Sequence, residues 1–521
     1  MMISKRIYLL SGLFLTTLIA LIITSCGGES YWRDLEDGSS SNTLPPSFPV
    51  GMYVSTTGND TTGDGSPGNP YQTIQNGITQ AAANGLHAVF VEAGTYNISA
   101  EILLLEGISL YGGFRPGDWN DRNVTPVARD TGSPYRTEII STALRAIRGD
   151  VPISSATVVE GFVIFGPTAF YNENNSNPRI SNNTIIGTGN VNSFGVYNLN
   201  SSPNIQFNLI IGTDTSASNA YGVYNIGGGS PSITGNYIYG SYIVSPSAVA
   251  TGVYNDGGLT TPIIAGNFIY GGPCASISRG VHNRNGAGPG IGYNRIESGD
   301  APQSWGVYDE DCGYFLIGND IRSGNGSISS EAVYCFNATT KIINNTIRGG
   351  PSNGYSTGIS LFNGSHAHIF NNTIDGGAGL ITARAIYIWI SNPLIINNIL
   401  FISGATGTRT GIYEGDPGTS DPVELTHNNF FDCPVLYRNS APPNNILNIG
   451  DVNDSAQTTQ GLPASATMNI SVVLTLNADF RIISPPPAVR DGGADLTGFL
   501  DDDKDENPRT VPWSIGAYEY D

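Results

Sequence analysis

The sequence predicts an all-β fold, a right-handed parallel β-helix with three sheets and coils of about 26 residues. Three observations support this prediction. An asparagine phrase recurs along most of the chain, and a second phrase of the type Gly-Val-Tyr-Asn recurs between its copies. Turn-forming residues separate these short phrases, with 66 Gly and 31 Pro in 521 residues. A period that holds three short β-rich pieces is what one coil of a three-sided solenoid requires.

The asparagine phrase is clearest in PRISNNTIIG (178–187), PSITGNYIYG (231–240) and KIINNTIRGG (341–350). Each copy has one asparagine in register, and successive copies lie 25 to 31 residues apart. We expect these asparagines to occupy left-handed corners and to hydrogen-bond from coil to coil. The expected ladder is Asn183, Asn208, Asn236, Asn267, Asn294, Asn319, Asn345, Asn372 and Asn398, with Asn428 continuing the series.

The second phrase predicts a strand whose aliphatic residue faces the core. It begins at residues 195, 222, 252, 280 and 306 and continues in weaker copies to residue 411. Because side chains alternate along a strand, an inward aliphatic residue forces the next residue outward. The expected inward stack is Val196, Val223, Val253, Val281, Val307, Val333, Ile359, Ile386 and Ile412.

The N-terminus has the pattern of an export signal. Lys5 and Arg6 precede an apolar run from Ile7 to Ile23, and Ile-Thr-Ser-Cys ends it at residue 26. This pattern resembles the lipobox of bacterial lipoproteins, which implies cleavage before Cys26 and a lipid, palmitate included, on its sulfur. The location implied is the cell envelope, at the outer membrane or cell surface. A transmembrane anchor is the alternative, but about 17 apolar residues are at the short limit for a span.

These features divide the chain into four parts. Residues 1–25 are the expected signal peptide, and residues 26–50, rich in Ser, Gly, Pro and acids, are a flexible tether. Residues 51–440 are the β-helix with an N-terminal cap, and residues 441–521 are the C-terminal coils and cap.

The charge balance excludes a nucleic-acid partner. The formal net charge is −20, and the only lysines are Lys5, Lys341 and Lys504. Nucleic-acid binding requires clustered Lys and Arg to displace counterions from phosphates. The partners that we expect are the membrane, through the lipid, and a polysaccharide or another cell-surface ligand.

Four further cysteines are compatible with disulfides in an oxidising compartment: Cys274, Cys312, Cys335 and Cys433. Cys312 and Cys335 lie close to one coil apart and are the best-placed pair. Their registers differ by about three positions, so free thiols are the alternative. No spacing of Cys and His indicates a zinc site.

The N-terminal stretch YVSTTGNDTTGDGSPGNPYQTIQNGITQAAANG (53–85) and the C-terminal WSIGAYEY (513–520) extend the pattern beyond the repeats. With them, the chain resembles the pectin-lyase-like superfamily of right-handed parallel β-helices over roughly residues 51 to 521. The resemblance implies a capping helix, whose apolar face here is Ile74, Ile78, Ala81 and Ala82. It does not imply one activity, because that superfamily includes lyases, hydrolases, esterases and adhesins.

The outward residue of the second phrase is aromatic in most coils. The expected file is Tyr197, Tyr224, Tyr254, Tyr308, Tyr334, Tyr387 and Tyr413, with Trp305 beside it. Aromatic rings spaced along one face are suited to stacking on the apolar side of sugar rings. The alternative is a ladder of rings that stack on one another and only shield the sheet.

Near its middle the file has polar residues that suggest chemistry. Arg279 or His282 is a candidate base for β-elimination next to a uronate, and Asp309 with Glu331 is a candidate acid–base pair for glycoside hydrolysis. The motifs of polygalacturonases are absent, and Lys341 is the only lysine of the repeats. A surface ion-pair network is therefore the alternative.

The acidic run at residues 501–506 places Asp501, Asp503 and Asp505 at alternate positions, where calcium is a candidate ligand. The EF-hand pattern is not satisfied, and a solvated loop is the alternative.

Three functions are compatible with these features. The first is a surface lipoprotein whose tyrosine-lined β-helix makes carbohydrate or adhesive contact. The second is a polysaccharide lyase or glycoside hydrolase, and the third is a structural spacer. The sequence favours the first and does not require an enzyme.

Overall fold

The computed structural model describes residues 50–123, 135–215, 217–242, 247–404, 407–416, 420–440, 443–454, 462, 466–497 and 501–520. The signal peptide, Cys26 and nearly all of the tether lie outside these ranges. Two compact units divide the chain, residues 26–275 and residues 276–521. Within the ranges described, no helix is both long and apolar enough to cross a membrane.

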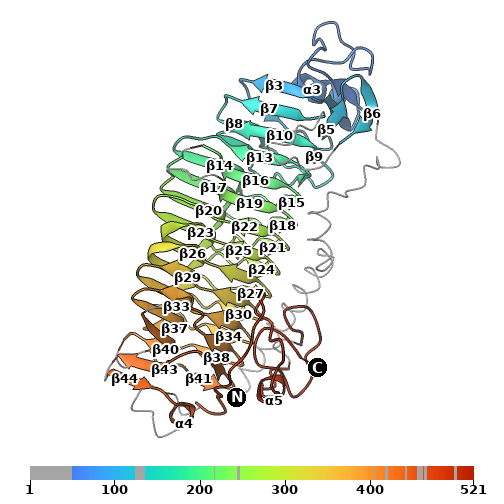
Figure 1. The fold of residues 1–521 in the computed structure, drawn as a ribbon. Coiled ribbons are helices and arrows are strands. Elements are labelled where there is room, and N and C mark those ends of the chain that lie inside the picture. Colours follow the sequence, from blue (N-terminus) through green and yellow to red (C-terminus); the bar gives the residue numbers. More distant parts are fainter. Residues whose placement is uncertain are drawn as a thin grey trace. The chain divides into compact units, whose positions relative to one another are not determined.

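The unit of residues 26–275 contains three parallel sheets, to which successive coils add one strand each (Figure 1). The first sheet contains β1 (Met52–Val54), β2 (Ala88–Glu92), β5 (Ser109–Arg115), β9 (Val158–Glu160), β12 (Arg179–Ser181), β15 (Asn204–Gln206), β18 (Ser232–Thr234) and β21 (Ile263–Ala265), and β6 (Asp118–Arg122) pairs antiparallel with β5. The second contains β3 (Gly94–Ile98), β7 (Thr137–Ser141), β10 (Phe162–Gly166), β13 (Thr184–Gly187), β16 (Leu209–Thr213), β19 (Tyr237–Ser241) and β22 (Phe268–Tyr270). The third contains β4 (Ile102–Leu103), β8 (Arg145–Gly149), β11 (Thr168–Asn172), β14 (Asn192–Leu199), β17 (Asn219–Ile226) and β20 (Val249–Asp256).

The unit of residues 276–521 repeats the same arrangement. Its first-sheet strands are β24 (Gly290–Gly292), β27 (Phe315–Ile317), β30 (Lys341–Ile343), β34 (His368–Phe370), β38 (Leu394–Ile396) and β41 (Glu424–Thr426). Its second-sheet strands are β25 (Arg295–Glu297), β28 (Asp320–Arg322), β31 (Thr346–Arg348), β35 (Thr373–Asp375), β39 (Ile399–Phe401) and β42 (Asn429–Phe430). Its third-sheet strands are β23 (Ile277–Arg284), β26 (Ala301–Glu310), β29 (Gly326–Phe336), β33 (Tyr355–Phe362), β37 (Thr382–Trp389), β40 (Thr408–Glu414), β43 (Val435–Ser440) and β44 (Pro443–Ile446), with the short β32 (Pro351–Ser352) and β36 (Ala378–Gly379) beside them.

The aliphatic stack of the second phrase forms as predicted. Val196 lies in register with Val223, and all nine predicted residues from Val196 to Ile412 are fully buried. The expected three-sheet solenoid is therefore confirmed.

The asparagine ladder also forms, with one correction. The amide of Asn208 donates to Ile180 O at 2.8 Å and to Asn236 Oδ1 at 3.0 Å, and Asn208 Oδ1 accepts from the backbone N–H of Asn183 at 3.0 Å. The left-handed corner, however, lies one residue earlier, at Asn182 (φ 53°) and its equivalents. That corner turns the chain, and the next residue can then direct its amide into the solenoid.

Helix α3 (Ile74–Ala83) packs on the first coils of its unit, against β1 and β2. Thr73 caps it by accepting from Asn76 N at 3.3 Å. Ile74, Ile78 and Ala81 are buried as predicted, but Ala82 is exposed. At Gly77 the helix approaches the strands so closely that a Cβ atom would meet the Val54 side chain at 2.6 Å.

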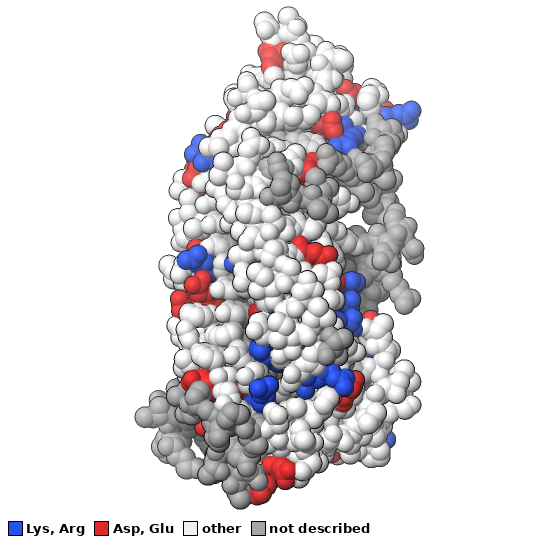
Figure 2. Space-filling view, turned by 60° about the vertical axis from the view of Figure 1, so that its left-hand side comes forward, with Lys and Arg blue, Asp and Glu red and all other residues white. Residues whose placement is uncertain are grey.

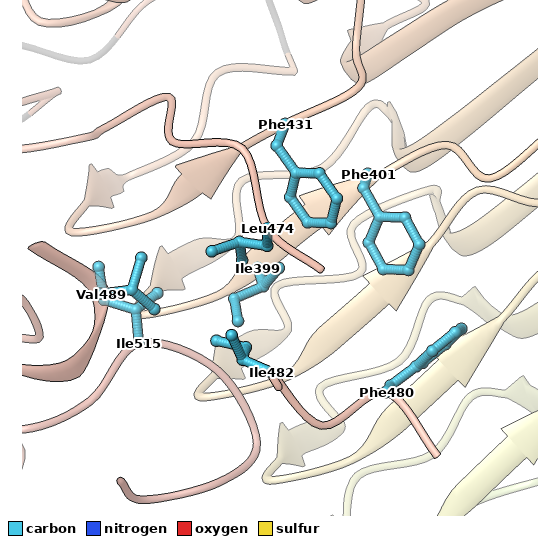
Figure 3. Packing of buried hydrophobic residues seen from close by; sticks show 8 residues of the cluster. All are labelled: Ile399, Phe401, Phe431, Leu474, Phe480, Ile482, Val489 and Ile515. Atoms are coloured by element: carbon cyan, nitrogen blue, oxygen red, sulfur yellow. The ribbon is translucent and has the colours of Figure 1, made fainter. Parts of the chain in front are cut away.

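The C-terminal segment differs from the predicted coils and cap. Thr467 and Ile470 bridge to Thr426 and Asn429 as a partial coil, and α4 (Ile449–Val452) precedes them. The chain then returns over the outside of its own unit. There Phe480, Ile482 and α5 (Pro487–Arg490) join a buried cluster, whose members are Ile399, Phe401, Phe431, Leu474, Phe480, Ile482, Val489 and Ile515 (Figure 3).

Specific hydrogen bonds hold this returning segment. The amide of Asn397 donates to Ala494 O at 2.8 Å and accepts from Ala494 N at 2.7 Å. Arg509 donates to Asn344 Oδ1 at 3.0 Å and forms a buried ion pair with Glu519 at 3.1 Å. The returning segment thus bonds to Asn344 and Asn397, which occupy left-handed corners. The side chains at these corners are not members of the asparagine ladder.

Cys312, Cys335 and Cys433 are free thiols, so the Cys312–Cys335 disulfide is not formed. The three-position difference in register gives the two residues different surroundings. Cys335 occupies the interior and contacts Asp309 Oδ2 at 3.8 Å, whereas Cys312 contacts Glu310 O at 3.0 Å.

Candidate functional site

The outer face of the third sheet carries the predicted tyrosine file. In residues 26–275, Tyr197 lies in register with Tyr224, and Tyr224 with Tyr254. Their rings are nearly parallel: the centroids of Tyr197 and Tyr224 are 5.0 Å apart, and those of Tyr224 and Tyr254 are 4.5 Å apart. Inner members of the file therefore have their faces covered by neighbouring rings. The geometry matches the self-stacking ladder, and the faces of these rings are not open to sugar stacking.

A second outer file lies beside the first. Phe194 and Tyr221 stack with centroids 5.4 Å apart, and Tyr221 meets Tyr224 edge to face at 4.9 Å. Burial raises the pKa of Tyr224, with neighbouring tyrosines adding to the shift. The outer face of the third sheet thus presents ring edges and neutral hydroxyl groups. Packing on both sides of each ring fixes the side-chain rotamers.

In residues 276–521 the same face contains Trp305, Tyr308 and Tyr334. Tyr308 and Tyr334 stack with centroids 4.9 Å apart and planes 3° apart, and Trp305 lies 4.9 Å from Tyr308. Tyr387 and Tyr413 continue the file, with centroids 5.5 Å apart and a tilt of 54°.

Arginines lie on these rings. The guanidinium of Arg279 is 4.9 Å from the Tyr308 centroid, and that of Arg384 is 4.3 Å from the Tyr387 centroid. In the other unit, Arg145 lies 4.0 Å from the Tyr171 centroid. These distances are those of cation–π contacts. Elsewhere on the visible surface charged side chains are sparse, and several basic and acidic groups lie side by side (Figure 2).

The predicted acid–base pair is not assembled. Asp309 follows the outward Tyr308 and therefore points inward, where its carboxylate accepts from Asn283, Tyr314 and Thr340 at 2.7 to 3.0 Å. Glu331 instead lies on the outer side, accepting from Trp305 Nε1 at 3.4 Å. The two carboxyl groups occupy opposite sides of one sheet, so the hydrolysis hypothesis that joins them is wrong.

His282 and Arg279 share the outer face with the rings. His282 is buried edge-on against Tyr308, with centroids 5.0 Å apart. Burial lowers the pKa of His282 well below its usual value, and Arg279 and Arg284 lower it further. The imidazole is consequently neutral near pH 7, while Arg279 is held against Trp305 and Tyr308.

The acidic run near residue 503 has partners of its own. Asp503 is almost fully buried and accepts from the backbone N–H groups of Asp505, Asn507 and Glu519 at 2.8 to 2.9 Å. Asp505 pairs with Arg481. The expected set of Asp501, Asp503 and Asp505 therefore does not converge on one point. Across the described ranges, no group of three or more His, Cys, Asp or Glu side chains is placed to hold a metal ion.

A second asparagine ladder, which the sequence analysis missed, lies beneath the tyrosine file. Asn172 donates to Asn198 at 2.9 Å, Asn198 to Asn225 at 2.8 Å, and Asn225 to Asn255 at 2.7 Å. The sequence contains a signal for this ladder, because the asparagine that ends the Gly-Val-Tyr-Asn phrase recurs with the period of the coils. Alternation after an outward tyrosine places that residue inside.

No family model matches the sequence, and no curated protein matches it. Among solved structures, a pectate lyase, Pel9A, is 13% identical over 90% of this chain and 96% of that chain, with a TM-score of 0.36. The surface adhesin PfbA of Streptococcus pneumoniae is 13% identical over 67% and 90%, with a TM-score of 0.38. The catalytic unit of a GH87 α-1,3-glucanase from Streptomyces thermodiastaticus is 14% identical over 73% and 68%, with a TM-score of 0.35. The chain's own sheets and coils form a three-sheet parallel β-helix.

Proposed function

We propose that the chain is a cell-surface lipoprotein whose third sheet binds a polysaccharide on its aromatic outer face and holds it without cleavage. The observation that carries this proposal is the pair of outer files in residues 26–275, in which Phe194 and Tyr221 lie beside Tyr197 and Tyr224. These files present apolar ring edges next to phenol hydroxyls at the spacing of successive coils, about 4.8 Å. A sugar chain has the same mixture of C–H surface and hydroxyl groups.

Two further observations favour binding over cleavage. Asp309 and Glu331 do not form an acid–base pair, and neutral His282 is buried against Tyr308. The lipid anchor expected on Cys26 would keep such a surface at the cell envelope.

The test is a glycan array probed with the full-length chain in a zwitterionic detergent that carries no sugar. The variant Tyr197→Ala/Tyr224→Ala removes ring edges from the outer face of the third sheet. The matched control Tyr239→Ala/Tyr270→Ala removes two rings from the second sheet, where Tyr239 and Tyr270 also contact each other, with centroids 6.0 Å apart. We expect the third-sheet variant to lose at least about tenfold in affinity while the control binds as the intact chain does.

Binding that both variants lose equally, or no binding by the intact chain, would reject the proposal and favour a protein-binding adhesin or a spacer. Any polymer that binds is also incubated with the chain, and its reducing ends are counted. A steady release of new ends would make the protein an enzyme.

A further inference from the structure

Four exposed apolar side chains lie at the corner between the second and third sheets of residues 276–521. They are Ile328 in β29, Tyr355 at the start of β33, and Leu380 and Ile381, which directly precede β37. Their exposed fractions are 56%, 43%, 56% and 56%. We call these four residues the apolar ridge. Large apolar side chains that are exposed together in this way mark a contact site more often than isolated ones do.

Backbone contacts hold the three coils of the apolar ridge side by side. Ile381 N donates to Gly354 O at 3.1 Å. On the other side of Gly354, a Cβ atom added to it would collide with Ile328 O. The ridge therefore spans three successive coils, about 10 Å in all. Gly354 has no side chain to separate the two isoleucines, and Tyr355 follows it directly, so the apolar side chains form one surface.

The turns that carry the apolar ridge contain no charged residue. Their sequences are GSIS (326–329), PSNGY (351–355) and AGLIT (378–382). Arg384 is the cation that contacts the ridge, and its guanidinium is held against the rings of Tyr355 and Tyr387, 5.1 Å and 4.3 Å from their centroids. In the coil before Ile328, exposed Asp300 accepts from Asn325 N at 2.8 Å. The ridge thus presents apolar area with an acid near its border, which does not favour an anionic partner.

The size of the apolar ridge distinguishes between kinds of partner. A stable protein interface takes roughly 20–30 residues from each side, whereas this corner exposes four large apolar side chains among the residues described. A lipid bilayer needs no matching surface, because each apolar side chain that enters the boundary between headgroups and acyl chains is stabilised by its own burial. Tyrosine is favoured at the same depth, where its ring is in apolar surroundings and its hydroxyl reaches water. The ridge therefore fits a bilayer better than a protein surface.

The corresponding corner of residues 26–275 is apolar as well. Leu144 and Val191 lie in turns that lead from the second to the third sheet, before β8 and β14, and they are 66% and 67% exposed. Tyr242, which follows β19, is 50% exposed. Exposed apolar residues at this corner are thus a property of the repeat in both units and not of a single loop.

We propose that the apolar ridge is a membrane-contact site, at which Ile328, Leu380 and Ile381 enter the headgroup boundary of a zwitterionic lipid bilayer. This inference rests on the proposed function, because the anchor expected at Cys26 holds the chain at a bilayer and so raises the local concentration of lipid. The lipid is zwitterionic, since the net charge of −20 and Asp300 repel anionic headgroups. Contact at this corner orients the third sheet of residues 276–521 relative to the membrane.

The test uses the full-length chain on phosphatidylcholine vesicles that include phosphatidylcholine with a photoreactive diazirine in its acyl chain. After irradiation, mass spectrometry identifies the peptides that carry lipid. The variant Ile328→Ser/Leu380→Ser/Ile381→Ser removes the aliphatic side chains of the apolar ridge. The matched control Ile390→Ser/Leu447→Ser removes two side chains of the same unit that lie outside this corner and are 43% and 63% exposed. All five residues are exposed, so both variants should fold, and thermal unfolding checks this.

We expect lipid on the peptides that contain the apolar ridge in the intact chain and in the control, and at least about tenfold less in the ridge variant. Replacing part of the phosphatidylcholine with phosphatidylglycerol should not raise the yield, because no charge attraction is involved. The ridge variant should still bind glycans on the array as the intact chain does, since its tyrosine file is unchanged.

Three outcomes would overturn the inference. If the intact chain stays on the vesicles but its ridge peptides carry no more lipid than those of the ridge variant, the membrane contact is wrong and the proposed function stands. If the intact chain is a dimer in detergent and the ridge variant is a monomer, the apolar ridge binds a second copy of the chain instead. A chain that does not stay on the vesicles would overturn both this inference and the anchor in the proposed function.

Discussion

At the scale of single residues, Asp309 shows how one substitution changes the chemistry of a repeat. The equivalent positions in residues 26–275 hold Asn198, Asn225 and Asn255, which form a neutral hydrogen-bonded ladder. Asp309 accepts from Asn283 at 2.9 Å, so it takes the place of a ladder asparagine in residues 276–521. An acid in this position has to be buried without a cation. The burial raises the pKa of Asp309 to about 6.

This shift predicts a pH-dependent stability that Asp309→Asn removes. The folded pKa of Asp309 lies above its unfolded value near 3.8, so the proton favours the folded state. The contribution of Asp309 to the free energy of unfolding should fall as pH rises from about 4 to about 6 and then level off, a loss of about 3 kcal/mol. Asp309→Asn should match the wild type at pH 4 and exceed it at pH 7, as measured by urea denaturation.

A second buried acid sets the background for that measurement. Burial raises the pKa of Glu414 to about 9, and Tyr437 donates to this carboxyl group. Stability should therefore decline further between about pH 5 and pH 9 in both proteins, and the Asp309→Asn difference must appear on top of it. Equal slopes for the two proteins between pH 4 and pH 6 would show that Asp309 titrates normally.

The inward position of Asp309 was available from the sequence, because alternation after outward Tyr308 requires it. What the sequence could not supply is the partners. Tyr314 and Thr340 reach Asp309 from the loops that follow two successive third-sheet strands. They occupy one register position, but most copies of the repeat hold proline there, so the repeat does not predict a hydrogen-bonding side chain. The same limit applies to Glu331 on the outer side of the third sheet. The alignment of Glu331, Thr357 and Arg384 follows from the repeat, but the absence of an ion pair depends on side-chain geometry.

At the scale of elements, the repeat predicted the strands better than their corners. Ladder residues such as Asn208 were identified correctly because a buried side-chain amide recurs with the coil. The left-handed residue was placed one position late, because Asn182, Phe207 and Gly235 share a conformation but not a residue type. The tyrosine file left two interpretations open, and only the ring distances in the structure favour self-stacking.

Asn208 tests what the ladder contributes. Asn208→Ala removes the acceptor of Asn183 N and leaves that buried N–H without a partner, and it also removes the amide bonds to Ile180 O and Asn236 Oδ1. The unpaired donor costs about 1–3 kcal/mol and each lost bond about 1 kcal/mol, so we expect a loss of roughly 3 kcal/mol or more by urea denaturation. Asn192→Ala is the control, since exposed Asn192 only accepts from Asn219 at 2.9 Å. Its cost should stay within about 0.5 kcal/mol. Similar losses for both variants would mean that the buried ladder has no special role.

At the scale of the whole molecule, composition and period sufficed for the fold class, whereas the returning C-terminal segment escaped prediction. Its contacts, such as Asn344 with Arg509, join residues 165 apart and have no repeat to reveal them. The surface adds a further whole-molecule property. With a net charge of −20 and three lysines, the chain has little means of holding an anionic membrane by charge. In the proposed function, stable attachment to the envelope therefore depends on the lipid expected at Cys26.

Cys26 provides the corresponding test. In a bacterial host, labelled palmitate should appear in the chain, and the chain should fractionate with membranes and partition into detergent. Cys26→Ser should abolish labelling and release the chain from the membrane fraction, because a hydrophobic signal without the modified cysteine supplies no acyl chain. Cys274→Ser is the control, since that cysteine lies in the β-helix and should leave both properties unchanged. If the intact chain takes up no label and both it and Cys26→Ser stay in the membrane fraction, the apolar run from Ile7 to Ile23 is itself the anchor, and the lipoprotein assignment is wrong.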